Sequence, residues 1–430
     1  MPGSPLGVVI VGGGLGGLCL AQGLRQAGVG VTVYERDASP DVRHQGYRIH
    51  IDQRGAQGLA ACLPPPLYDL VVATAGRPGR QVTVLTHHLK TRRIVRFAGE
   101  AAAPRPASAA LDAAPLNAAV NRRTLREILL AGLDDVVHFG KEFTHYEQGA
   151  DGRLCAHFAD GTRAEGDVLV AADGTGSRVR RQYLPHAAVV DTGARCIYGK
   201  TPLTAETRPL VPAAVADGFT AVVGPHAIGL ALGLMEFRHR PEAAAAALDP
   251  RVPVHPADDY LMWGVTAQRE RVALTDAELL ALDGPALQQV ALRLTARWHA
   301  SVGALIARCA VAETFALTIR TAVPLAPWPT TTVTLLGDAI HAMSPAGGSG
   351  ANTALRDAGL LCRHLVAAAR GETPLLMAIG AYENEMVAYG FDAVRASQQA
   401  PGRFFNATAL VWLTHGLSGL AHRLRSARWA

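Results

Sequence analysis

The chain has 430 residues, of which 49% are hydrophobic and 18% are charged, and its formal net charge is +5. This composition excludes a disordered or collagen-like chain and is typical of a globular protein with two or three structural units. The 41 basic residues are scattered and only three of them are lysines. Nucleic-acid-binding proteins usually gather basic residues in a stripe, so we expect no nucleic-acid partner.

The six cysteines form no CxxC pair and show no metal-ligand spacing. They are typical of buried thiols in a reducing compartment, and we expect no metal site. No apolar stretch is long enough to span a membrane. We therefore expect a cytoplasmic protein without stable membrane association.

Residues 7–36 show the pattern of a strand, a glycine-rich turn, a helix and a second strand. Gly12, Gly14 and Gly17 have GxGxxG spacing. The first glycine permits a tight turn, the second lets a pyrophosphate approach the backbone, and the third lets helix and strand pack closely. The helix begins near Leu15, where free N–H groups favour a phosphate.

The second strand of this unit ends in Glu35, 18 residues after Gly17. An acid at this place can accept hydrogen bonds from ribose hydroxyls. Because strand, helix, second strand and acid are all present, residues 7–36 predict a dinucleotide site. The motif alone does not distinguish NAD from FAD.

Two later segments repeat the arrangement of a buried strand that delivers an acid. Residues 168–172 precede Asp173, and residues 333–336 precede Asp338. Asp338 could hydrogen-bond a polyol hydroxyl of a cofactor. The glycine-rich loop and helix start that follow it would stabilise negative charge on a reduced isoalloxazine ring.

These three motifs, in this order, resemble those of the class A FAD-dependent monooxygenases, the para-hydroxybenzoate hydroxylase-like family. Their spacing is similar to that of the tetracycline-inactivating monooxygenases. The most specific motif is GDxxHxxxPxxGxGxN at residues 337–352. The resemblance covers about the first 180 residues and residues 320–385.

The resemblance implies an α/β fold with a Rossmann-like FAD-binding domain, a second, β-sheet-rich substrate domain and a C-terminal helix. The FAD-binding domain would comprise residues 1–75, 112–183 and 320–400. The substrate domain would comprise residues 76–111 and 184–319, and the helix residues 401–430.

The resemblance also implies further cofactor-binding residues. Arg43 would lie near the flavin and the incoming nicotinamide, His50 stands where relatives often carry Asp, and Arg122 would touch the phosphate and ribityl region. Ser344 and Ser349 stand where the family often has Pro and Gln. Neither change alters the role expected for the backbone of the loop. The other residues implied are Glu35, Arg36, Asp173, Asp338, Pro345, Gly348, Gly350, Ala351 and Asn352.

Alternating apolar residues in the remaining half of the chain predict strands. The segments are 81–86, 94–97, 194–200, 220–223, 228–235 and 261–265. By the resemblance, these strands form a sheet that covers the ring of the flavin. Tyr198, His226 and Trp263 are candidate substrate contacts, although each also suits a core or surface position.

The implied function is an FAD-dependent, NAD(P)H-consuming monooxygenase that hydroxylates an aromatic or polyketide-like molecule through a flavin C4a-hydroperoxide. FAD would carry the chemistry, so no side chain is assigned a catalytic role. The partners would be the small-molecule substrate, O₂ and NAD(P)H, and the chain would be a monomer or homodimer. The alternatives are a Baeyer–Villiger oxygenase, an epoxidase, or a non-oxygenating flavin dehydrogenase or reductase.

Overall fold

The computed structural model describes residues 6–40, 42, 47–96 and 116–405. Two predictions therefore lie outside the described residues: the position of Arg43, and the helix expected over 401–430 beyond residue 405.

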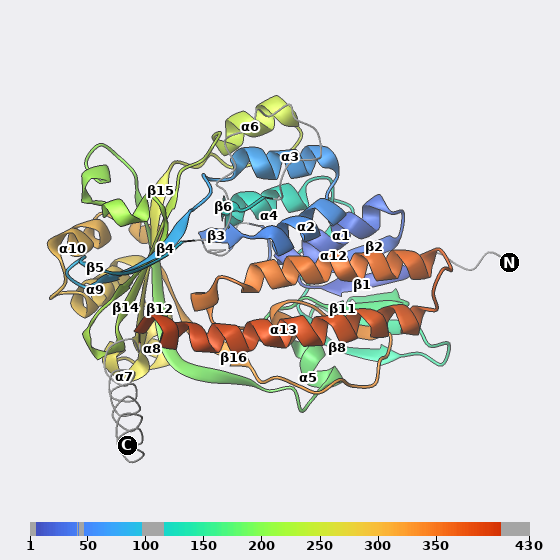
Figure 1. Ribbon diagram of the computed structural model, residues 1–430. Coiled ribbons are helices and arrows are strands. Elements are labelled where there is room, and N and C mark those ends of the chain that lie inside the picture. The colour runs from blue at the N-terminus through green and yellow to red at the C-terminus, as the bar shows by residue number, and fades with distance from the viewer. Residues whose placement is uncertain (1–5, 41, 43–46, 97–115, 406–430) are drawn as a thin grey trace, which may run out of the picture.

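A five-stranded sheet, entirely parallel, forms one half of the molecule (Figure 1). Its strands come from three distant parts of the chain and are mostly buried, as apolar parallel strands covered by helices must be. In spatial order they are β17 (Val333–Leu335), β11 (Val168–Ala171), β1 (Gly7–Val11), β2 (Gly30–Tyr34) and β7 (Val137–His138).

Long helices pack on this sheet. Helix α12 (Gly350–Ala369) contacts α1 (Leu15–Gln26), α2 (Gln53–Cys62) and α13 (Leu375–Phe405), which runs beside it in Figure 1. The remaining helices of four or more residues are α3 (Pro65–Thr74), α4 (Arg122–Leu130), α5 (Arg178–Tyr183), α6 (Pro241–Leu248), α7 (Arg269–Val272), α8 (Asp276–Ala281), α9 (Gly284–Leu294), α10 (Ala300–Ala307) and α11 (Asp338–His341).

A seven-stranded mixed sheet forms the other half of the molecule (Figure 1). Adjacent strands in this sheet are antiparallel, except β13 and β4, which are parallel. The six strands predicted for this half are confirmed. In spatial order the strands are β16 (Phe315–Ala322), β12 (Val189–Pro202), β15 (Tyr260–Gln268), β14 (Gly229–Met235), β13 (Gly218–Val223), β4 (Gln81–Thr86) and β5 (Thr91–Arg96).

Each face of the seven-stranded sheet has its own apolar cluster. Trp263, Leu261 and Val265 of β15 pack with α8, α9 and α10 on one face. Tyr260 and Met262, at the alternate positions, pack on the other face with residues near the parallel sheet. This second face is the one that can cover a cofactor bound at the parallel sheet.

Two small sheets complete the fold. The pair β3 (Arg48–Ile51) and β6 (Ala118–Asn121) contacts β14 of the seven-stranded sheet, and β3 also contacts helix α12. A three-stranded antiparallel sheet contains β8 (Phe143–Gln148), β9 (Leu154–Phe158) and β10 (Arg163–Gly166). Short 3-10 turns occur at Arg208–Leu210, Ala213–Val215, Pro225–Ala227, Val311–Glu313 and Pro345–Gly347.

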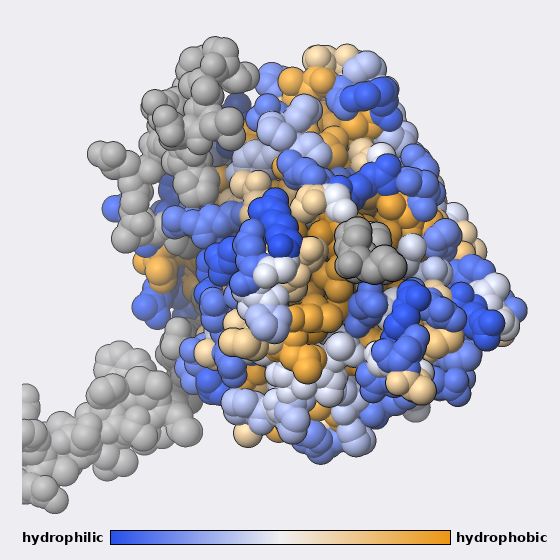
Figure 2. All heavy atoms as spheres, turned by 90° about the vertical axis from the view of Figure 1, so that its right-hand side faces the viewer, coloured by the Kyte–Doolittle hydropathy of each residue, from blue (hydrophilic) through white to orange (hydrophobic). Residues whose placement is uncertain are grey.

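Figure 2 views the molecule from the side of the parallel sheet, where hydrophilic side chains surround smaller apolar areas. Within the described part of the chain, no helix has both the length and the apolar character needed to cross a membrane.

Candidate active site

The motif residues meet at one edge of the parallel sheet. Gly12 follows β1, Glu35 follows β2, Asp173 comes two residues after β11, and Asp338 comes three residues after β17. These four strands are consecutive neighbours and run in the same direction. Their carboxyl ends therefore deliver three acids and the glycine turn to the same edge, which is where open α/β sheets bind ligands.

The three glycines of the turn do different things. Gly12 has φ +113°, and a Cβ there would lie 2.3 Å from the Ala172 carbonyl oxygen. A Cβ on Gly17 would lie 2.2 Å from the Gly12 carbonyl oxygen, whereas nothing lies within 4 Å of one on Gly14. Gly12 and Gly17 thus permit close packing, and Gly14 leaves open space at the N-terminus of α1, ahead of the buried Leu15.

Glu35 is buried and holds the glycine turn in place. Its Oε2 accepts a hydrogen bond from the Gly13 N–H at 2.7 Å, and its Oε1 accepts one from the Asp37 N–H at 3.0 Å. Each carboxylate oxygen keeps a second acceptor site, so ribose hydroxyls could still bind. The neighbouring Arg36 is exposed.

Arg126 is a site residue that the sequence reasoning missed. It is buried on α4, its Nε donates to the Gly13 carbonyl at 3.2 Å, and its Nη1 donates to the Pro40 carbonyl at 2.9 Å. The only signal in the sequence was its place one helical turn after Arg122. The Arg126 guanidinium thus ties the glycine turn to the segment that follows β2.

Asp173 and Arg180 carry buried polar atoms without partners among the described residues. Asp173 Oδ2 accepts from the Arg178 N–H at 2.8 Å, but its Oδ1 has no partner, and burial raises the pKa of this carboxyl. Arg180 Nη1 donates to the Ala339 carbonyl at 2.7 Å, while its Nε has no partner. Unpaired buried polar atoms cost about 1–3 kcal/mol each, so a polar ligand at this edge would be favoured.

Asp338 is accessible to solvent, yet enough protein surrounds it for desolvation to raise its pKa. A carboxyl group on the wall of a recess has both properties: it is exposed to solvent and partly desolvated. The nearby charge of Arg122, at the start of α4, acts in the opposite direction and lowers the pKa. No hydrogen bond to the Asp338 carboxylate comes from the described residues, so its acceptors are available to a cofactor hydroxyl.

A buried ion pair positions the turn that presents Asp338. Asp357 Oδ2 lies 2.6 Å from His341 Nε2 and accepts from the Gly337 N–H at 2.7 Å. Asp357 Oδ1 accepts from the Tyr389 hydroxyl at 2.6 Å. Burial lowers the pKa of His341, but the Asp357 carboxylate outweighs it, and the pKa is raised overall. His341 and Asp357 together hold the turn in place, which is a structural role.

The glycine-rich loop leads from Pro345 into α12, which begins at Gly350 and continues through Ala351. Gly348 has φ +62° and open space around its Cβ position, which suits the approach of a flat ring. The first N–H groups of α12 have no partner within the helix and point toward this loop.

The Asn352 side chain ties the loop to β3. Its Nδ2 donates to the His50 carbonyl at 2.7 Å and the Gly348 carbonyl at 3.1 Å, and its Oδ1 accepts from the Asp52 N–H at 2.9 Å. Both amide N–H groups are used, so a cofactor contact here would come from the backbone.

Burial lowers the pKa of the His50 imidazole, with Arg48 acting in the same direction.

A cavity of about 480 Å³ lies between the two halves of the molecule. Its lining includes Tyr47, Asn121, Lys200, Tyr260 and Glu313. Lys200 Nζ lies 5.7 Å and 5.4 Å from the ring centroids of Tyr47 and Tyr260, and 2.7 Å from a Glu313 carboxylate oxygen. The cavity thus places two tyrosine rings beside the Lys200–Glu313 ion pair, an arrangement that could not be predicted from the sequence.

The three predicted substrate contacts have different outcomes. Tyr198 lies on the cofactor-facing side of the sheet, stacked on Phe315 with centroids 5.7 Å apart. Trp263 is fully buried in the apolar cluster on the opposite face, so its prediction is wrong.

His226 is exposed in the turn between β13 and β14. That turn precedes Gly229 at the start of β14, whereas the cavity residue Tyr260 pairs with Met235 at the other end of the strand. The six residue steps between Gly229 and Met235 span about 20 Å. His226 therefore does not line the cavity, and its prediction as a substrate contact is wrong.

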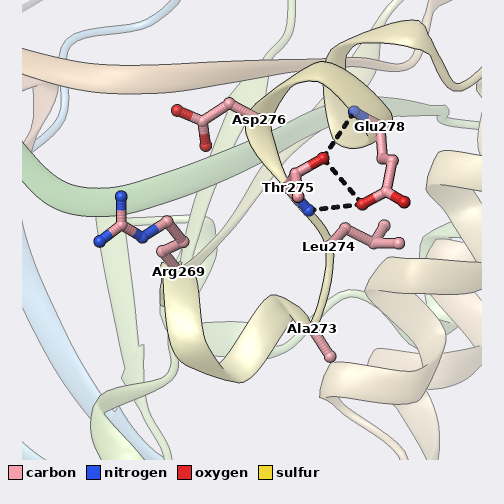
Figure 3. A pocket seen from close by; sticks show the side chains of 6 residues that line it. All are labelled: Arg269, Ala273, Leu274, Thr275, Asp276 and Glu278. Carbon is pink, nitrogen blue, oxygen red and sulfur yellow. Dashed lines mark hydrogen bonds between the residues drawn. The ribbon is translucent and has the colours of Figure 1, made fainter.

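A second depression, of about 590 Å³, lies at the turn between α7 and α8 (Figure 3). Thr275 and Glu278 bond each other there as a capping box, and Asp276 pairs with Arg195 at 2.7 Å. Thr275, Asp276 and Glu278 are thus engaged in helix capping and an ion pair, and none of the motif residues lies here, so we do not assign this depression as the active site.

The fold and the strand-end site together define a dinucleotide-binding protein of the flavoprotein type. A family model described as an FAD binding domain matches residues 258–397, and one described as an NAD(P)-binding Rossmann-like domain matches residues 10–71.

Two similar proteins match across most of this chain. A Photorhabdus luminescens structure, provisionally described as an FAD-containing monooxygenase, is 31% identical with a TM-score of 0.77, and the match covers 94% of this chain and 100% of that one. The dual O-methyltransferase/FAD-dependent monooxygenase elcB of Phaeosphaeria nodorum is 33% identical over 87% of this chain and 42% of its own length. The chain spans less than half the length of the first curated relatives it matches.

The tetracycline destructase Tet(51) has a TM-score of 0.61 at 15% identity, over 99% of this chain and 98% of that one, and this supports the fold alone. The chain belongs to the family of FAD-dependent monooxygenases. The resemblance inferred from the three motifs is thereby confirmed.

Proposed function

We propose that the protein is an FAD-dependent monooxygenase that consumes NAD(P)H and O₂. The observation that carries the proposal is the convergence of the glycine turn, Glu35, Asp173 and Asp338 at the ends of four adjacent parallel strands. Family membership supports the same reading.

The described residues fit FAD. Glu35 would accept from the adenosine ribose, the N–H groups at the start of α1 would bind the pyrophosphate, and Asp338 would accept from the ribityl chain. The unpaired atoms of Asp173 and Arg180 offer further polar contacts. When bound, FAD supplies redox chemistry with NAD(P)H and O₂ that no side chain provides.

We infer an aromatic or polyketide-like substrate, hydroxylated in the cavity between the halves. The cavity volume is typical of small-molecule sites, and the Tyr47 and Tyr260 rings offer stacking surfaces. Lys200 would attract an electron-rich or anionic ring, and the seven-stranded sheet would exclude bulk water. A related protein, the aurachin C monooxygenase/isomerase of Stigmatella aurantiaca, is 27% identical and is matched over 80% of its length.

The test is coupling of NAD(P)H oxidation to a substrate. The FAD-loaded protein would be screened with phenols and polycyclic aromatic compounds while NAD(P)H, O₂ and H₂O₂ are followed together. A substrate that speeds NAD(P)H oxidation and suppresses H₂O₂ release supports a monooxygenase. NAD(P)H oxidation that proceeds equally well without O₂, with another acceptor, would identify a dehydrogenase or reductase. Product fragmentation would separate hydroxylation from Baeyer–Villiger oxygenation or epoxidation.

A further inference from the structure

Two histidines and a glutamate meet on the three-stranded sheet, a part of the fold that the proposed function does not use. His145 and Glu147 lie on β8, and His157 lies on β9. One potential ligand atom of each lies within 4.8 Å of those of the other two. Register pairs His145 directly with His157 across the strands.

A bulge in β8 creates this meeting. Phe143 pairs with Phe158 and both are buried, but the register shifts before His145, which pairs with His157. Without the shift, strict alternation would place His145 and Glu147 on the buried face with Phe143. The extra residue, Thr144, turns both side chains to the outer face, and bulges recur where a side chain must be re-aimed.

The distances approach those of a metal site. Glu147 carboxylate oxygens lie 3.5 Å from His157 Nε2 and 3.9 Å from His145 Nε2. Ligand bonds of about 2.0–2.1 Å in a tetrahedral zinc site place neighbouring ligand atoms about 3.4 Å apart. The two imidazole rings are parallel, with centroids 4.4 Å apart. The side chain of His145 is 52% exposed and can tilt to direct its nitrogen at the same ion.

Thr144 sets the tautomer that a metal needs. Its hydroxyl donates to the His157 carbonyl at 2.9 Å, so it can only accept from His145 Nδ1, 3.1 Å away. The proton of neutral His145 therefore sits on Nδ1, and Nε2 keeps its lone pair facing Glu147. His157 Nε2 is itself buried and has no hydrogen-bond partner among the described residues.

We propose that His145, Glu147 and His157 bind one divalent transition-metal ion of the zinc type, with a fourth position open to water. Imidazole and carboxylate ligands suit Zn²⁺, and two histidines with one carboxylate make a sufficient protein set. The ion would join β8 to β9 across the bulge. The expectation of no metal site rested on the cysteine spacing, whereas these three ligands are two histidines and a glutamate from two strands.

Helix α5 connects the proposed metal site to the residues around the cofactor. The Gln182 side chain of α5 bonds the backbone of Tyr146 on β8 twice, at 3.0 Å and 2.7 Å. Helix α5 also carries Arg180, which reaches the Ala339 carbonyl beside Asp338. We therefore expect a metal-dependent rise in thermal stability, because binding to the folded state alone stabilises it.

The test uses the untagged, FAD-loaded full chain after treatment with a chelator, because a histidine tag would bind the same ion. Zn²⁺ is titrated against a chromophoric competitor, and bound metal is counted by elemental analysis. One equivalent is expected, together with a higher melting temperature. His157→Ala should lose the site, and Thr144→Val should weaken it about 10- to 100-fold, as loss of a supporting contact typically does.

His186→Ala is the matched control, because His186 is exposed and outside the cluster. It should bind Zn²⁺ like the parent protein. The variants on this exposed face should retain FAD, which separates failure of the metal proposal from failure of the proposed function. Absence of Zn²⁺ binding in the parent protein, or equal binding by parent, His157→Ala and Thr144→Val, would overturn the proposal.

Discussion

At the scale of single residues, we expect Asp338 to contribute most to the affinity for FAD. Asp338 has acceptors that the described residues leave open, whereas Glu35 already binds two backbone N–H groups. We predict that Asp338→Ala weakens FAD affinity about 5- to 150-fold, since hydrogen bonds worth about 1–3 kcal/mol are lost. Fluorescence titration of the apoprotein with FAD measures this. Asp134→Ala, at an exposed turn, is the control, and equal affinity in both variants would remove Asp338 from the site.

At the scale of elements, the packing of α2 against α12 sets the position of the glycine-rich loop. A Cβ on Gly58 would lie 2.1 Å from the Leu355 carbonyl oxygen, so backbone must move. We predict that Gly58→Ala destabilises the protein by about 1–3 kcal/mol. In α10, nothing lies within 4 Å of a Cβ on Gly303, so Gly303→Ala should stabilise by about 0.5–1 kcal/mol. Urea unfolding of the two variants should move the midpoints in opposite directions; a shift in the same direction would refute the packing argument.

At the scale of the whole molecule, one buried acid makes stability depend on pH. Glu383 of α13 accepts from the Thr330 and Thr334 hydroxyls at 2.8 Å and 2.9 Å, yet burial raises its pKa from 4.5 to about 7. The folded protein therefore holds this proton more tightly than the unfolded chain does. The resulting stabilisation is complete below pH 4.5 and is lost as the pH rises through about 7.

Glu383→Gln should remove this dependence. Between pH 5 and pH 8 the free energy of unfolding of the parent protein should fall, relative to the variant, by up to about 3 kcal/mol. Chemical denaturation at several pH values measures the difference. Parallel pH profiles for the two proteins would show that Glu383 does not titrate as its burial implies.

The molecule also shows which features a sequence can reveal. The strand-end motifs are contiguous in sequence, and the parallel order of β17, β11, β1 and β2 brings their ends together, so fold and cofactor edge could be predicted. Trp263 was misplaced because both faces of β15 are buried, and alternation of apolar residues cannot then tell one face from the other. The Tyr47, Lys200 and Tyr260 chamber could not be predicted, because it joins segments that only the tertiary fold brings together.

We propose that this chain transfers one atom of O₂ to a small molecule. The most direct measurement is turnover of a coupled substrate under ¹⁸O₂ with NAD(P)H, followed by mass spectrometry of the product. We predict a product that carries one labelled oxygen atom, the other atom being released as water. A product without label, or one formed at full rate in the absence of O₂, would contradict the claim and identify a flavin dehydrogenase on the same fold.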